Sequence, residues 1–128
     1  MLDLERLLAQ PEGQYFERKS LWDRPPKGIK VLDRRKVRDL IAENVAAFAN
    51  ADGGTLVLGV DDDGTPSGHG YPPEEVEKML RVPEQRLAPP QRAGAAFPWK
   101  GQELLVFEVP SAEKAVMVVG DGFPRRVD

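Results

Sequence analysis

The clearest hydrophobic pattern lies between Asp33 and Gly53. Side chains suited to one buried helix face recur there at steps of three and four residues: Val37, Leu40, Ile41, Asn44, Val45 and Phe48. This spacing predicts a helix of about 16 residues, which Asp33 begins as an N-cap and the pair Gly53-Gly54 ends. Small alanines in its second half permit close packing, so we expect that half to be buried.

Other segments have the hydrophobic pattern of strands. Thr55–Val60 is a continuous run of aliphatic and β-branched side chains, which is typical of a central strand. Gln14–Ser20 alternates between two faces and predicts a short strand. Glu103–Val109 and Ala115–Val119 predict two more strands, and Lys100-Gly101 predicts the turn of a hairpin.

Shorter helices and loops complete the prediction. Leucines at positions 2, 4, 7 and 8 predict an opening helix that Pro11 ends, and Pro73 begins a helix that runs to about Leu80. Trp22–Val31 is expected to be a polar loop. The order of these elements predicts an α+β fold, a compact α/β sandwich with a mixed β-sheet flanked by helices.

Composition places the chain among ordinary globular domains. Its 128 residues are 41% hydrophobic and 30% charged, and no apolar run approaches the roughly 20 residues of a membrane span. The lack of cysteine excludes disulfides and thiol chemistry and, with an N-terminus that has no signal-peptide features, predicts a cytoplasmic protein. We expect residues 1–128 to form one domain. Since no polar tail precedes Asp128, we expect this domain to be the N-terminal part of a longer protein.

Charge is divided unevenly along the chain. The formal net charge is −3, but residues 18–38 contain nine basic and two acidic side chains, a net +7 against −10 elsewhere. This basic segment predicts contact with nucleic-acid phosphates, and the alternative is a solvated face that only aids solubility. Trp22 in this segment is either a stacking platform for a base or a core anchor. The candidate nucleic-acid-binding residues are Lys19, Arg24, Lys27, Lys30, Arg34, Arg35, Lys36 and Arg38.

Acidic side chains occur near the ends of two predicted strands. Glu12 and Glu17 flank the start of the first strand, and Asp61–Asp63 follow the central strand. If these strands are neighbours, the carboxylates could converge and bind Mg²⁺ or Mn²⁺, which activates water against a phosphodiester. The alternative is a solvated Asp-Asp-Asp-Gly turn. Lys19 could neutralise phosphate charge beside the acids or form a surface ion pair.

Two further motifs predict structural roles. Asn50–Gly54 contains glycines but no phosphate-binding loop sequence, so we expect a polar turn between the long helix and the central strand. His69 is the single histidine and has no serine or cysteine triad around it, so we expect no catalytic role for it.

Three stretches of the chain carry a family pattern. Glu12–Ser20 (EGQYFERKS) has a glutamate, a second glutamate five residues on, and then a lysine. Ala46–Gly64 (AAFANADGGTLVLGVDDDG) is the most specific stretch, and Leu104–Pro110 followed by Gly120–Arg126 is the loosest. Together they resemble the Schlafen AlbA-2 domain over nearly all of the chain, with little contribution from residues 80–98.

This resemblance implies a compact α/β sandwich whose best-attested role is nucleic-acid binding, in Schlafen proteins and in bacterial transcriptional regulators and RecG-like helicase relatives. In vertebrate Schlafens, two such modules form a clamp that cleaves tRNA and related RNA at a metal-dependent site. By the same resemblance, Glu12, Glu17 and Asp62 correspond to the metal-binding and catalytic carboxylates, and Lys19 to the lysine beside them. Arg18 departs from the pattern, because family members often have an aromatic residue there.

Three functions therefore remain open. The first is a nucleic-acid-binding domain, for DNA or RNA and largely backbone-directed, of a bacterial regulator-type protein. The second is a Mg²⁺- or Mn²⁺-dependent endoribonuclease acting on structured RNA, which as a single module would need a homodimer or a partner. The third is contact between the basic segment and an acidic protein. No ATPase activity and no membrane partner are expected, and Mg²⁺ or Mn²⁺ would be needed only by the nuclease.

Overall fold

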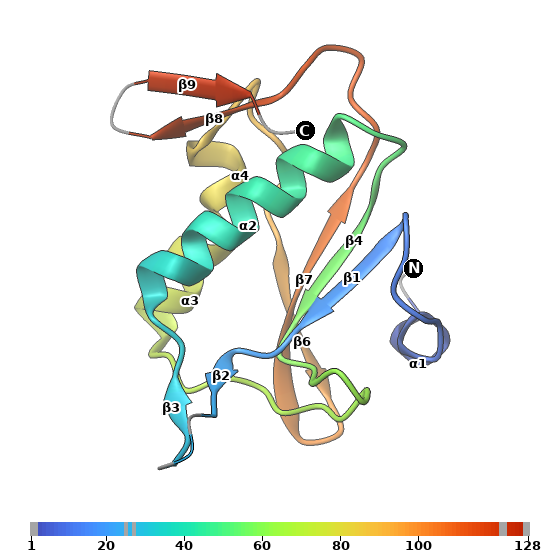
Figure 1. The fold of residues 1–128 in the computed structure, drawn as a ribbon, viewed down its shortest axis with the longest axis vertical. Helices are drawn as coiled ribbons and strands as arrows, with labels where there is room; N and C mark the ends of the chain where they lie inside the picture. The colour runs from blue at the N-terminus through green and yellow to red at the C-terminus, as the bar shows by residue number, and fades with distance from the viewer. Residues whose placement is uncertain (1–2, 25, 27, 121–122, 127–128) are drawn as a thin grey trace.

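A four-stranded mixed sheet forms the centre of the molecule. The computed structural model describes residues 3–24, 26, 28–120 and 123–126. The sheet has the strand order β1-β4-β7-β6 (Figure 1). Its strands are β1 (Phe16–Lys19), β4 (Gly54–Leu58), β7 (Gln102–Val109) and β6 (Ala95–Trp99). Because β1 is parallel to β4 while β7 is antiparallel to both β4 and β6, the predicted α+β fold with a mixed sheet is confirmed.

The most apolar strand lies inside this sheet, as its sequence predicts. Leu56, Val57 and Leu58 of β4 are fully buried. Leu56 and Leu58 belong to the main core, whereas Val57 belongs to a second core. Successive side chains of a strand point to opposite faces, so both faces of the sheet are covered at β4. A strand that is buried on both faces has no solvent-facing position that would favour a polar residue, which explains the continuous apolar run.

Helix α2 (Arg34–Ala49) covers one face of the sheet (Figure 1). Its N-cap is Asp33, whose side chain accepts hydrogen bonds from the backbone N–H groups of Arg35 and Lys36 at 2.8 and 3.2 Å. These two bonds hold the pKa of Asp33 below its usual range. The buried side chains are concentrated in the second half of the helix, as the alanines there predict.

The opposite face carries a smaller core. Helix α1 (Leu4–Leu8) places Leu4 against this face. The other buried members of this core are Phe16, Val57, Val60, Leu104 and Val106.

Two further helices and a second sheet lie on the side of α2. They are α3 (Pro73–Leu80), α4 (Val82–Gln85) and a small sheet in the order β5-β8-β9, formed by Leu87–Ala88, Met117–Gly120 and Phe123–Arg126. Asn50, at the end of α2, fixes the chain before β8, because its side chain donates to the carbonyl oxygen of Val116 and accepts from the N–H of Val116 at 2.9 and 2.7 Å.

Several predictions made from the sequence were incomplete. The ends of the expected loop Trp22–Val31 pair as a short hairpin of β2 (Trp22–Asp23) and β3 (Lys30–Val31). The turn at Lys100-Gly101 is confirmed, with φ of 50° and 81°, the left-handed values of the tight turns that match strand twist. Among the described residues, no helix has the length and apolar character to cross a membrane.

Candidate functional site

A tight turn brings Glu12 and Glu17 together. Gly13 and Phe16 exchange two backbone hydrogen bonds of 3.0 and 3.4 Å around the two residues between them. The next pair outward from such a turn is formed by residues 12 and 17, so a spacing of five residues makes their side chains neighbours. The two carboxyl groups are close enough for Glu17 to act on the pKa of Glu12.

Burial and the neighbouring acid raise the pKa of Glu12 above its ordinary value. Partial desolvation contributes most, and the interaction with the neighbouring Glu17 carboxyl group, including charge repulsion, adds to it. Arg18 and Lys19 oppose the shift: Arg18 Nε lies 3.9 Å from Glu12 Oε1, and Lys19 Nζ lies 3.2 Å from Glu17 Oε1. The two acids and Lys19 therefore lie together at β1.

Arg18 links this acidic pair to the turn after β4. Its guanidinium donates to the backbone carbonyl oxygens of Gln10 and Asp62 at 3.2 and 2.9 Å. It also lies over the ring of Phe16, 5.9 Å from the ring centre. Because the side chain is only 15% exposed, Arg18 is a structural bridge between the two segments that carry the predicted acids.

The three aspartates of the turn have separate roles. Asp61 pairs with Arg24 at 3.1 Å and accepts from Ser67 at 2.8 Å, and Asp63 accepts from the backbone N–H of Thr65. The side chain of Asp62 is exposed. In the described part of the chain, no group of three or more His, Asp or Glu side chains is arranged to hold a metal ion. The structure thus joins Glu12 to Glu17 and does not add Asp62 to them as a ready-made metal site.

Glu12→Gln should stabilise the protein slightly at neutral pH. A carboxyl whose pKa is raised on folding contributes stability below its ordinary value of 4.5, and this contribution is lost as the pH rises through the raised value. A neutral amide removes the repulsion by Glu17. The urea midpoint of the variant should therefore exceed that of the wild type at pH 7, and the difference should disappear near pH 4. Glu113→Gln, at an exposed position, is the control, and equal behaviour of the two variants would contradict the prediction.

Several residues of the basic segment are used inside the fold. Glu75 on α3 is 1% exposed and is held by two arginines of α2. Arg38 Nη1 lies 3.0 Å from Glu75 Oε2, and Arg34 Nη1 lies 3.4 Å from Glu75 Oε1. Arg24 pairs with Asp61, as above, and Lys27 lies outside the described residues. These contacts were not predicted, because the sequence does not show that an acid on α3 faces the first turns of α2.

Three basic side chains remain exposed on one continuous stretch. Lys30 of β3 and Arg35 and Lys36 of α2 are exposed, and none of them forms an ion pair with any described residue. We call Lys30, Arg35 and Lys36 the basic face. The first turn of α2 contains no acidic residue, so the positive end of the helix dipole adds to their charge.

The other candidate residues have structural roles. Trp22 donates from its ring nitrogen to the carbonyl oxygen of Ser67 at 3.0 Å, which makes it an anchor for the loop before α3. His69 accepts the N–H of Tyr71 at Nδ1, so Nε2 carries the proton and donates to Glu103 at 2.8 Å. Asn50–Gly54 forms the predicted polar turn, and the backbone N–H of Gly53 donates to the carbonyl oxygen of Phe48 at 2.9 Å.

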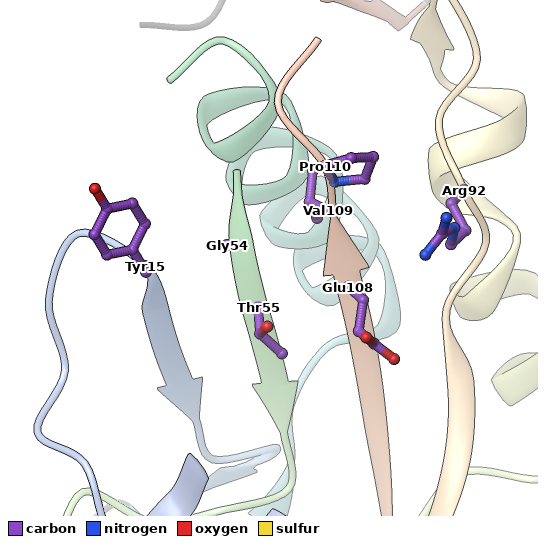
Figure 2. A pocket seen from close by; sticks show the side chains of 7 residues that line it. All are labelled: Tyr15, Gly54, Thr55, Arg92, Glu108, Val109 and Pro110. Atoms are coloured by element: carbon purple, nitrogen blue, oxygen red, sulfur yellow. The ribbon is translucent and has the colours of Figure 1, made fainter. Parts of the chain in front are cut away.

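A pocket that the sequence did not indicate lies at the N-terminal ends of β1 and β4. It has a volume of about 360 Å³ and is lined by Tyr15, Gly54, Thr55, Arg92, Glu108, Val109 and Pro110. Figure 2 shows Tyr15 on one side, Arg92 on the other, and Thr55 and Glu108 on neighbouring strands between them. In the sequence, only Tyr15 at the start of a predicted strand could have indicated this pocket. Arg92 could not, because it lies in a proline-rich stretch with no clear hydrophobic pattern.

Comparison with known proteins gives a family and a fold. The model of the family described as Schlafen, AlbA_2 matches residues 12–126. The N-terminal domain of a RecG-related protein from Nitrosomonas europaea is 26% identical, with a TM-score of 0.63 over 98% of this chain and 85% of that one. DIP2311 from Corynebacterium diphtheriae is 20% identical, with a TM-score of 0.63 over 98% of this chain, which spans only 26% of the length of DIP2311. None of the curated proteins compared with this chain is significantly similar to it.

Proposed function

The chain belongs to the Schlafen AlbA_2 family, and from this premise we propose that it is a domain that binds DNA or RNA through the phosphate backbone. The RecG-related protein whose N-terminal domain shares its fold is described as an ATP-dependent DNA helicase relative, which supports a nucleic-acid ligand. For the whole protein, we propose a bacterial regulator-type role.

The basic face carries this proposal. Lys30, Arg35 and Lys36 are exposed on adjoining parts of β3 and α2. Basic residues in the first turn of a helix are unfavourable beside the positive end of the helix dipole. Such an arrangement suits an anion, because the helix dipole and the three side chains attract phosphate.

Simultaneous replacement of Lys30, Arg35 and Lys36 by glutamine should weaken nucleic-acid binding at least tenfold at low salt. Each lost phosphate contact also lowers the salt dependence, so the slope of log affinity against log salt should fall by two to three units, at roughly 0.7–0.9 per contact. Fluorescence anisotropy with labelled duplex DNA, duplex RNA and single-stranded RNA between about 50 and 200 mM salt measures both quantities.

The matched control replaces Arg6, Lys100 and Lys114 by glutamine. These three residues are exposed and lie on neither β3 nor α2. This variant has the same change in net charge and should keep most of the affinity. If both triple variants lose affinity equally, binding depends on overall charge and the basic face is not the interface. Wild-type binding that does not change with salt would contradict the electrostatic mechanism itself.

A metal-dependent ribonuclease is the second candidate. The neighbouring carboxyl groups of Glu12 and Glu17, Lys19 beside them, and the Arg18 bridge to Asp62 favour it. A bound Mg²⁺ or Mn²⁺ would supply an activated water. Glu12 and Glu17 would hold the ion, and it would have to draw the exposed side chain of Asp62 towards them.

Cleavage of structured RNA tests this candidate. Cleavage should require Mn²⁺ or Mg²⁺, stop with EDTA, and be abolished by Glu17→Gln while Glu113→Gln leaves it unchanged. Cleavage that survives both EDTA and Glu17→Gln would exclude these acids as its source. Size-exclusion chromatography with and without RNA would show whether two copies assemble, and binding to an acidic protein alone would favour the interaction role instead.

A further inference from the structure

The pocket beside Tyr15 lies on the part of the sheet that the small core leaves uncovered. Thr55 and Glu108 are paired residues of β4 and β7. They precede Val57 and follow Val106 on the same sheet face, and both valines are buried in the small core. On this face of the sheet, the side chains of β4 and β7 therefore change from apolar in the small core to polar at the pocket. Tyr15 and Arg92 border this polar end (Figure 2).

The polar side chains of this pocket have no partners within the described part of the chain. The side chains of Tyr15, Arg92 and Glu108 form no hydrogen bond or ion pair with any residue that the structure describes. Tyr15 is 57% exposed. An acceptor carboxylate, a donor guanidinium and a free aromatic face are thus gathered around one hollow, and all three are available to a ligand.

We infer that this pocket binds a single unpaired guanine base. The inference extends the proposed function, because an unpaired base in a single-stranded segment is the natural source of such a ligand. Exposed aromatic side chains on a sheet are platforms for single-stranded bases, and each stacked base contributes substantially to affinity.

The chemistry of Glu108 and Arg92 selects guanine among the four bases. The Watson–Crick edge of guanine offers two adjacent donors, N1–H and the N2 amino group, beside the acceptor O6. A carboxylate can accept from both donors, while an arginine next to it donates to O6. Adenine instead presents the acceptor N1 beside its single amino group, so a carboxylate there would face a lone pair.

Titration of the intact chain with 5′-GMP and 5′-AMP, followed by NMR chemical shifts, tests the pocket directly. GMP should bind at least fivefold more tightly than AMP. Glu108→Gln and Arg92→Met should each remove this preference, whereas Tyr15→Ser should weaken both nucleotides at least fivefold because stacking does not depend on the base. Glu113→Gln is the control and should change neither affinity.

A second experiment uses seven-nucleotide RNA single strands that have guanosine or adenosine at the central position and uridine at the others. The guanosine strand should bind more tightly, and this preference should persist when Lys30, Arg35 and Lys36 are replaced although both affinities fall. If no strand binds but GMP is still preferred, the proposed function fails and the pocket stands as a site for the free nucleotide. Absence of any guanine preference, or a preference that Glu108→Gln leaves intact, would overturn the inference.

Discussion

Arg38→Met should lower the free energy of unfolding by about 3 kcal/mol, the largest effect we expect from a single side chain of the basic segment. Arg38 makes two contacts with the carboxylate of Glu75, at 3.3 and 3.0 Å. Glu75 is 1% exposed, so without Arg38 its charge stays buried beside Arg34 alone, whose side chain is 61% exposed. A buried charge that loses its main partner keeps its desolvation penalty.

Urea denaturation of three variants separates this effect from a general loss of charge. Arg35→Met, one turn earlier and exposed, should change stability by less than about 0.5 kcal/mol. The double variant Arg38→Met with Glu75→Met should recover more than half of the loss, because both charges are then removed together. If Arg38→Met and Arg35→Met have the same midpoint and slope, Glu75 does not depend on Arg38.

The pair of Glu75 and Arg38 also shows where sequence reasoning reaches its limit. The basic segment was correctly recognised as a concentration of charge, but an arginine that faces a phosphate and one that faces a buried carboxylate look alike in a sequence. The sequence places Glu75 only near the start of the helix that Pro73 begins. Its burial follows from the packing of α3 against α2, which is a tertiary contact between residues about 40 positions apart.

Elements with a clear hydrophobic pattern of their own were predicted correctly from the sequence. The period of three and four residues determined α2, and the unbroken apolar run of β4 indicated a strand covered on both faces. The hairpin β2–β3 was missed, because Trp22 and Val31 pair through a loop with no strand pattern. Helix α4 and strand β5 are only four and two residues long, so they have too few residues for a period to be visible.

Residues of the candidate site could likewise be predicted from local sequence patterns, but the contacts that join them could not. Glu12 and Glu17 were named as candidates from their places in the family pattern, but their proximity follows from the tight turn between Gly13 and Phe16, which the sequence did not predict. The position of Asp62 depends on Arg18, whose bond to the backbone of Asp62 spans 44 residues. The pocket at Tyr15 draws on four segments distant in sequence, so only the folded structure reveals it.

Gly53→Ala should lower the free energy of unfolding by about 2–4 kcal/mol, since two separate penalties act at this position. Gly53 has a φ of +83°, which costs any other residue about 1–2 kcal/mol. An added Cβ would also lie 2.7 Å from the carbonyl oxygen of Val109 and 3.0 Å from the nitrogen of Ser111. Both are backbone atoms, so the turn between α2 and β4 would have to move away from β7.

Gly64→Ala measures the first penalty alone. Gly64 has a φ of +89°, but an added Cβ there would meet no atom within 4 Å. The free energies of unfolding of the two variants, obtained from urea denaturation at equal slopes, should therefore differ by at least about 1 kcal/mol, with Gly53→Ala the less stable. Equal losses would mean that only backbone conformation matters at Gly53. The expected difference would instead show that this glycine is required because β7 passes too close for any side chain, which ties the most specific stretch of the family pattern to the packing of the central sheet.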